Sequence, residues 1–179
     1  MKNIKKQLIV LRLLLTRNPI KRANYLKKKN IFKEFGDDCW YQPIKIPTQP
    51  KLIKIGNNVK IATEVLFMEH DIIHNMFNKK NQTDIFREKL GTIVIEDNVF
   101  IGARSIILYN TKIGKNCVIA AGSVVTHDIP ENCIAGGVPA KVIGNINDLE
   151  KKYEKYSLKY SDYNLHDDEV LEKLFWKDN

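Results

Sequence analysis

The sequence lacks any apolar run long enough to cross a membrane. Its longest run, Leu8–Leu11, is interrupted by Arg12 before Leu13–Leu15 continue it, far short of the ~20 residues that a bilayer requires. Basic residues precede this run, as they do in a secretory signal. No cleavage site of small residues follows it, so we interpret it as part of the folded protein.

Cysteine is scarce as well. Only Cys39, Cys117 and Cys133 occur in the chain, and their odd number and wide spacing indicate neither a disulfide framework nor a zinc knuckle. Because thiols stay reduced in the cytoplasm, this cysteine content favours a cytoplasmic protein.

Acidic residues are absent from the first 33 positions, which hold eleven Lys or Arg. The net charge of the chain is +8, so most of the excess lies in this segment. Such a segment suits nucleic acid, anionic lipid or a phosphorylated ligand. We expect no nucleic-acid partner, because interleaved aromatic residues and a recognisable binding module are missing.

The same basic segment has the spacing of helices. Apolar residues at Ile4, Leu8, Leu11 and Leu15 predict a helix over residues 1–16. Asn18-Pro19 interrupts the pattern, and residues 21–30 predict a second short helix. These helices pack on their own domain or on a neighbouring subunit, or they attach to a membrane surface with Lys and Arg on anionic lipid and Leu in the interface.

An internal repeat of six residues decides the fold. An aliphatic or aromatic residue recurs at this step, at Ile55, Ile61, Phe67, Ile95, Ile101, Ile107, Ile113, Ile119 and Val125. A small or β-branched residue follows four positions later, at Val59, Val65, Val99, Ser105, Thr111, Cys117 and Ser123. This period fits neither a helix nor plain strand alternation. It predicts a mainly β protein, a parallel β-helix in which three short faces joined by tight corners form a coil of about 18 residues.

The repeat is interrupted once, at residues 68–90, which contain His70 and His74. A solenoid pushes such insertions out of one corner, and they often carry the function. We therefore predict a β-helix domain over residues 35–143, preceded by the basic helical segment 1–34. A helical extension, 144–179, should cover the unpaired backbone at the end of the β-helix, with helices at 147–156 and 167–176.

Three runs of sequence resemble the hexapeptide-repeat acyltransferases. They are Ile-Glu-Asp-Asn-Val-Phe-Ile-Gly-Ala (95–103), Ile-Gly-Lys-Asn-Cys-Val-Ile-Ala-Ala-Gly-Ser-Val-Val-Thr (113–126) and Gly-Gly-Val-Pro-Ala-Lys-Val-Ile (136–143). That superfamily includes the galactoside, maltose, serine, streptogramin and polysaccharide acetyltransferases. The resemblance covers residues 35–143 and implies a left-handed parallel β-helix, a homotrimer, and acetyl-CoA in the groove between neighbouring prisms.

The resemblance also implies roles for particular residues. His70 matches the catalytic histidine, at the start of the inserted loop. Ala103 and Ala121 match the small residues that line the groove for acetyl-CoA. Thr126 and Lys141 match positions at the nucleotide end, where Lys141 would pair with phosphate.

The chemistry of acetyl transfer fits a histidine at this place. A hydroxyl or amine must lose its proton as it attacks the thioester, and a neutral imidazole can take that proton at cytoplasmic pH. Such a base contributes about 10²–10⁴-fold in rate. We expect Asp71 and His74 to contact the acceptor, and either Glu69 or Asp71 to orient His70. Cys117 is expected to be a core residue, because it occupies the small position of a repeat.

We therefore expect an acetyl-CoA-dependent O-acetyltransferase without a metal. Its acceptor would be a sugar hydroxyl of a surface polysaccharide, its precursor or a nucleotide sugar. An amino-sugar N-acetyltransferase and a non-catalytic binding scaffold are the alternatives. A zinc carbonic anhydrase on the same fold is disfavoured, because no third histidine joins His70 and His74 on a suitable face. The expected location is the cytoplasm, with peripheral contact to the inner face of the membrane left open.

Overall fold

The computed structural model describes residues 3–176 of the chain. It divides into two compact units, Met1–Ile146 and Asn147–Asn179. All strands belong to the first unit, which carries every residue matched to the acyltransferase pattern. The predicted divisions after residues 34 and 143 stay predictions. None of the described helices is long and apolar enough to cross a bilayer.

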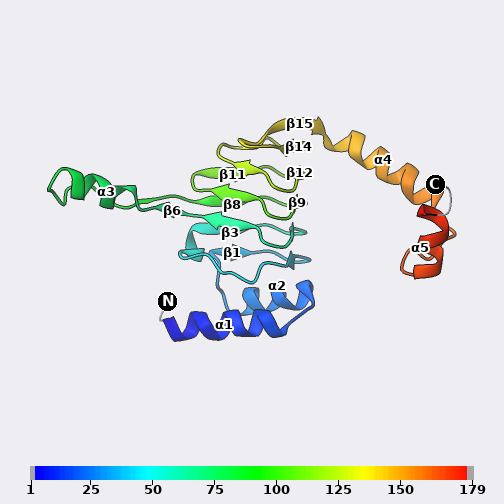
Figure 1. Cartoon of the computed structure of the whole chain (residues 1–179), viewed down its shortest axis with the longest axis horizontal. Helices are drawn as coiled ribbons and strands as arrows, with labels where there is room; N and C mark the ends of the chain where they lie inside the picture. Colours follow the sequence, from blue (N-terminus) through cyan, green and yellow to red (C-terminus); the bar gives the residue numbers. More distant parts are fainter. Residues whose placement is uncertain (1–2, 177–179) are drawn as a thin grey trace. The chain divides into compact units, whose positions relative to one another are not determined.

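Three sheets form the sides of a coiled prism (Figure 1). The first face consists of β1 (Glu34–Phe35), β3 (Ile53–Ile55), β8 (Ile93–Ile95) and β11 (Thr111–Ile113). The second face consists of β2 (Trp40–Tyr41), β4 (Lys60–Ile61), β9 (Val99–Ile101), β12 (Cys117–Ile119), β14 (Cys133–Gly136) and β15 (Lys141–Asn145). The third face consists of β5 (Leu66–Met68), β10 (Ile106–Leu108) and β13 (Val124–Val125). A short 3₁₀ helix, η1 (Pro50–Leu52), precedes β3.

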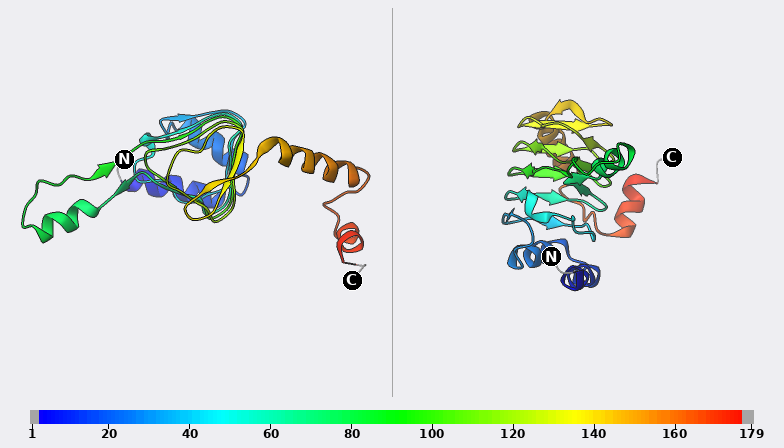
Figure 2. Two further views of the ribbon diagram at one scale, coloured as in Figure 1. Left: turned by 90° about the horizontal axis from the view of Figure 1, so that it is seen from above. Right: turned by 90° about the vertical axis from the view of Figure 1, so that its left-hand side faces the viewer.

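The strand register confirms the predicted repeat. Ile93 pairs with Thr111, and Val99 pairs with Cys117 on the next coil, in each case 18 positions further along (111 − 93 and 117 − 99). The pairs between successive coils are parallel, and within the three faces of the described prism only β14 and β15 pair antiparallel. Viewed along the stacking direction, the coils superpose as a three-sided outline (Figure 2).

The interior of the prism is a column of aliphatic side chains. Each residue at the six-residue step is at most 6% exposed: Ile55, Ile61, Phe67, Ile95, Ile101, Ile107, Ile113, Ile119 and Val125. The small residues four positions later are buried as well, including Ser105 and Ser123, whose hydroxyls both donate to the Ala120 carbonyl. Burial of this column is the main force that holds the coils together.

The corners of the prism depend on residues that tolerate a left-handed backbone. Asn58, Asn98, Asn116 and Asn132 have φ between 53° and 61° and form one stacked column. Their side-chain amides bond from coil to coil, at 2.9, 3.0 and 2.8 Å. Asparagine accepts this conformation more readily than most residues do, which explains why it recurs at one corner.

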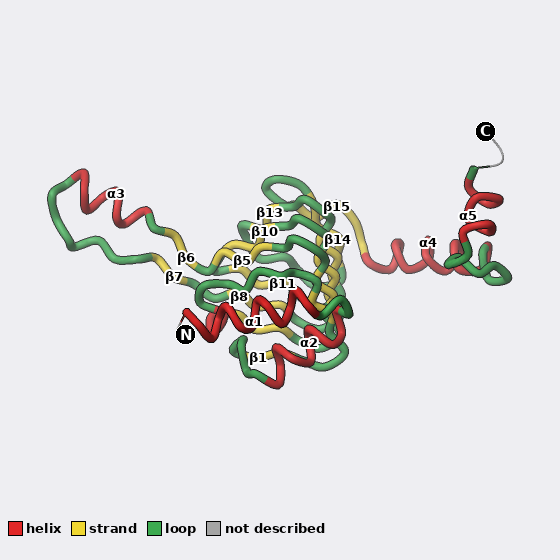
Figure 3. The backbone as a smooth tube through the Cα atoms, turned by 60° about the horizontal axis from the view of Figure 1, so that its bottom comes forward, coloured by secondary structure: helices red, strands yellow, loops and turns green. Residues whose placement is uncertain are grey.

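Helices α1 (Asn3–Leu15) and α2 (Pro19–Lys28) lie beneath the first coil (Figure 3). Both predicted helices are present, except that Met1 and Lys2 lie outside the described residues. The second begins two residues earlier than predicted, because Pro19 occupies the first helical position, where its missing N–H costs nothing. The buried Arg22 donates to the carbonyls of Thr16 and Gln42, at 2.5 Å each, and so joins the helices to the coil.

The inserted segment 68–90 forms an arm that extends away from the prism (Figures 1 and 2). Strands β6 (His70–Asp71) and β7 (Lys89–Leu90) pair antiparallel at its base, and helix α3 (Ile73–Lys80) follows β6. Near the tip, the rings of Phe77 and Phe86 lie 5.5 Å apart. The expected loop therefore has regular structure of its own.

The second unit is helical. Helix α4 (Ile146–Lys159) contains the predicted segment 147–156, and α5 (Asp168–Phe175) matches the second prediction. Asp167 begins α5 by accepting from the backbone of Glu169 and Val170, as a helix N-cap does. Whether this unit covers the end of the β-helix stays a prediction.

Candidate active site

His70 lies at the base of the arm, two residues beyond β5. Its side chain is 22% exposed, and its ring stands between two carboxylates. Glu69 Oε1 is 3.7 Å from Nδ1, and Glu88 Oε1 is 3.9 Å from Nε2. Within residues 3–176, the buried Nδ1 atom has no hydrogen-bond partner. The Nδ1 side of the ring is thus buried beside Glu69, while the side chain as a whole stays partly exposed.

Glu69 is the buried carboxylate behind His70. It is 1% exposed, and its Oε1 accepts a hydrogen bond from the backbone N–H of Gln49. Its carbonyl accepts from the N–H of Gly91, at 3.0 Å, where the arm returns to the prism. Glu69 therefore joins the first coil, the outgoing strand and the returning strand at one point, which fixes the place of His70.

Asp71 is engaged elsewhere. Its Oδ2 accepts from the Tyr109 hydroxyl at 2.7 Å, and its Oδ1 accepts from the Ile73 N–H at 3.0 Å. The bond from Tyr109, followed by the one from Ile73, lowers the pKa of Asp71, and the same bond raises the pKa of Tyr109. Of the two carboxylates considered for orienting His70, the geometry favours Glu69.

His74 lies on α3, one turn along the arm from Asp71. Its Nδ1 is buried and, like that of His70, has no hydrogen-bond partner among the described residues. The part of the chain that the structure describes gathers no group of three or more His, Cys, Asp or Glu side chains able to hold a metal ion.

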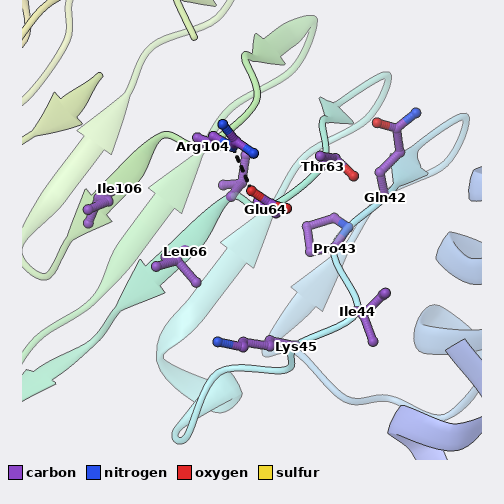
Figure 4. Close-up of a pocket in the computed structure, with 10 residues that line it drawn as sticks. Gln42, Pro43, Ile44, Lys45, Thr63, Glu64, Leu66, Arg104 and Ile106 are labelled. Carbon is purple, nitrogen blue, oxygen red and sulfur yellow. Dashed lines mark hydrogen bonds and ion pairs between the residues drawn. The ribbon is translucent and has the colours of Figure 1, made fainter. Parts of the chain in front are cut away.

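One cavity adjoins His70, and a second cavity lies next to the first. The smaller, of about 150 Å³, is lined by His70 and Glu69 together with residues 45–48 and 65–68. The larger, of about 450 Å³, has an apolar lining that includes Ile44, Leu66 and Ile106 (Figure 4). An ion pair of 2.7 Å between Arg104 and Glu64 lies beside it. Both cavities are lined by Lys45, Val65 and Leu66, so they are neighbours on the third face.

Ala103 and Ala121 occupy the same corner on successive coils, where the second face turns into the third. The N–H of Gly122 donates to the carbonyl of Ala103 at 2.8 Å. The coils approach so closely here that a Cβ on Gly102 would lie 2.4 Å from the backbone nitrogen of Ala121. Since Ala121 is exposed and Ala103 half-buried, this corner leaves a shallow surface beside the backbone.

Thr126 and Lys141 lie near the far end of the third face. Thr126 follows β13, and its hydroxyl is 2.7 Å from His127 Nδ1. Lys141 opens β15, directly after Ala140, whose N–H donates to the carbonyl of Val124 in β13 at 2.8 Å. The third face thus begins at the corner of small residues and ends near these two polar residues.

Some residues of this site carry no signal in the sequence. Glu88 and Lys45 reach His70 and its cavity from segments that lie outside the repeat. Tyr109 bonds Asp71 across 38 positions. A neighbouring position in sequence suggested Glu69 as a partner of His70, but its burial and its bond to Gln49 became visible only in the structure.

Known proteins share both the sequence pattern and the fold. The family described as "Hexapeptide repeat of succinyl-transferase" matches residues 92–127. A galactoside O-acetyltransferase of Lactococcus lactis is 34% identical over 157 residues, covering 75% of this chain and 72% of the relative. The galactoside O-acetyltransferase of Escherichia coli is 42% identical over 102 residues, 56% of this chain, and the match spans about half (48%) of that relative.

A solved structure of a galactoside acetyltransferase in complex with coenzyme A has the same fold, with a TM-score of 0.59 and 27% identity. The match covers 84% of this chain and 83% of the other. N-acetyltransferases are also among the relatives. One example is the 2,3,4,5-tetrahydropyridine-2,6-dicarboxylate N-acetyltransferase of Clostridium perfringens, which is 48% identical over 58 residues, 32% of this chain and 25% of that relative.

Proposed function

This chain belongs to the hexapeptide-repeat acyltransferase superfamily, and from that premise we propose that it transfers an acetyl group from acetyl-CoA to a sugar hydroxyl. The acceptor is a sugar of a surface polysaccharide, its precursor or a nucleotide sugar. One observation carries the proposal: the half-buried imidazole of His70, backed by the buried Glu69, lies at the edge of a cavity on the third face.

In the proposed reaction, His70 acts as the general base. Nε2 takes the proton of the acceptor hydroxyl while its oxygen attacks the thioester carbon. The tetrahedral intermediate then collapses. A carbon–oxygen bond has formed, the carbon–sulfur bond breaks, and the departing thiolate of CoA takes the proton from His70. Transfer is direct, so no acyl-enzyme is needed. Glu69 stabilises the imidazolium that forms between the two proton transfers, because its carboxylate lies 3.7 Å from Nδ1.

The CoA substrate would lie along the third face. The corner of Ala103 and Ala121 leaves backbone groups open to the pantetheine arm, and Thr126 and Lys141 would meet the nucleotide end, with Lys141 on phosphate. The complex of the related galactoside acetyltransferase with coenzyme A supports CoA as a ligand of this fold. Asp71 and His74 stay weaker proposals for acceptor contacts, since Asp71 is already bonded to Tyr109.

We further propose that three left-handed prisms form a homotrimer. The difference in polarity between the faces of the prism supports this assembly. The first face carries ion pairs between Lys54 and Glu34, at 2.6 Å, and between Lys112 and Glu96, at 2.8 Å. The second face instead presents Trp40 and Phe100, which are 41% and 44% exposed. Large apolar side chains on a face are typical of an interface. Packing through the second and third faces would leave the charged first face in water.

The acceptor pocket in this proposal is the larger cavity. Its volume of about 450 Å³ is sufficient for a sugar unit. Lys45 and the Arg104–Glu64 pair supply polar groups that could bond hydroxyls, and the aliphatic lining could pack on the apolar face of a ring. An amino sugar is the second candidate, because N-acetyltransferases are among the relatives. Nucleic acid has no place in the proposed reaction.

The test is release of free CoA thiol from acetyl-CoA, over a panel of sugars, amino sugars and nucleotide sugars. We expect His70→Ala to lower kcat by about 10²–10⁴-fold while acetyl-CoA still binds. His166→Ala, at an exposed histidine of the second unit, is the matched control and should leave the rate unchanged. Failure of the wild-type protein to bind CoA at all would overturn the enzyme and favour a binding scaffold.

A further inference from the structure

Helix α1 exposes four leucines on the side that faces away from the prism. Leu8, Leu11, Leu14 and Leu15, the basal leucine face, are 59%, 52%, 52% and 74% exposed. The helix contacts the rest of the unit mainly through Ile9, which is 7% exposed, and Leu13, which is fully buried. Figures 1 and 3 show α1 as the outermost layer beneath the first coil.

The helical geometry places these leucines together. Leu8, Leu11 and Leu15 follow one another at spacings of three and four, so they share one side of the helix. That side lies opposite Ile9 and Leu13. A helix that is apolar on opposite sides is stable when both sides are covered. The prism covers one side of α1, so the basal leucine face needs a second partner.

The charge around this face determines which partner fits. Exposed basic residues flank the leucines at Arg12 and Arg17. They continue at Lys21 and Lys28 on α2 and at its C-cap, Lys29. Acidic residues are absent up to position 33. Two copies of the chain meeting through this face would bring like charges together, which opposes association. The surface of an anionic bilayer can bury the leucines and attract the basic side chains at the same time.

We propose that the basal leucine face docks α1, lying in the plane of the interface, on a bilayer that contains anionic phospholipid. The leucines enter the boundary between headgroups and acyl chains, and the basic residues contact lipid phosphates. This inference goes beyond acetyl transfer and does not depend on it. If the prisms associate side by side in a parallel trimer, three copies of the face point the same way, and binding becomes multivalent.

The experiment is flotation of the full chain with vesicles of phosphatidylcholine alone or of phosphatidylcholine with phosphatidylglycerol. We expect the protein to float only with the anionic vesicles and to be released by high salt. The double substitution Leu11→Gln/Leu15→Gln should lower binding roughly 100-fold, about tenfold for each leucine removed from the interface. Both positions are exposed, so the fold should persist.

Leu158→Gln is the matched control, because Leu158 on α4 is also an exposed leucine, at 70%. It should bind vesicles as the wild type does. Neither variant should change CoA release with a soluble acceptor. Wild-type flotation that is equal on neutral vesicles, or that survives Leu11→Gln/Leu15→Gln, would overturn the proposal. A second result would also overturn the proposal: the wild type does not float, and analytical ultracentrifugation shows an assembly of the wild type that dissociates in the double variant. The basal leucine face would then join copies of the chain.

Discussion

Replacing Glu69 by glutamine removes a negative charge from behind His70 and leaves the shape of the side chain nearly unchanged. The remaining oxygen can still accept the N–H of Gln49. The wild-type carboxylate lies 3.7 Å from Nδ1. Two unit charges at that distance attract by about 4 kcal/mol at an effective dielectric constant of about 20. If roughly half of the proton is transferred in the transition state, Glu69→Gln removes about 2 kcal/mol of transition-state stabilisation, which lowers kcat roughly 30-fold.

The assay is the initial rate of CoA release at saturating acetyl-CoA, with kcat and KM determined separately. Because Glu69 is 1% exposed and lies behind the ring, we expect kcat to fall while the KM for acetyl-CoA changes little. Glu88→Gln is the matched control. Its carboxylate is 3.9 Å from Nε2, but its side chain is 41% exposed. Water screens such a pair, so kcat should fall by less than about threefold.

A Glu69→Gln enzyme with the wild-type kcat and an unchanged melting temperature would refute the argument, because it would show that the buried charge does not act on His70. Equal losses of kcat in Glu69→Gln and Glu88→Gln would refute it as well, since burial would then have no effect. A large fall in melting temperature with a normal kcat would assign Glu69 a purely structural role through Gln49.

Two further predictions concern ionisable groups, the Cys133 thiol and the Asp71 carboxyl. Burial, and secondly Cys117 with its sulfur 3.9 Å away, raises the pKa of Cys133 to about 11. At pH 8 about one such thiol in a thousand is ionised, so a disulfide reagent should label Cys133 only after unfolding, and prompt labelling of Cys133 in the native protein would contradict this. The bond from Tyr109 lowers the pKa of Asp71. The bond therefore stabilises the folded protein. This stability is fully present above the pKa that Asp71 has in the unfolded chain, and it is lost as the pH falls through the lower pKa of the folded protein. Tyr109→Phe should reduce the difference in urea stability between pH 7 and pH 3, and an unchanged difference would show that the bond contributes nothing.

The prism could be predicted from the sequence because the fold depends mainly on the inward-facing position of each repeat. Inward residues such as Ile101 and Ile119 must be apolar at a fixed step, and that constraint is visible without a structure. The start of α2 was missed by two residues, because Asn18-Pro19 reads as a break and also as the start of a helix. Helical spacing predicted α1, but not which of its leucines would be buried.

The candidate site was predicted only where it coincides with the repeat or interrupts it. His70 begins the interruption, and Ala103 and Ala121 share one corner, so family resemblance could mark all three. Glu69 is different, because its contact with Gln49 crosses 20 positions and depends on how the irregular segment before η1 packs. No periodicity encodes such a contact.

The outward positions explain why this fold reveals so little about its substrate. Within each repeat, the inward residue is constrained by the column, whereas the outward residue of the same strand is free. In this chain the outward positions give three different surfaces: ion pairs on the first face, Trp40 and Phe100 on the second, and a cavity beside His70 on the third. Substituting the outward residue Ile106, or Lys45 in the irregular segment before η1, should change the acceptor of the proposed reaction without disturbing the column. The acceptor of the proposed reaction is therefore encoded in residues that the repeat leaves free, and it must be found by testing substrates.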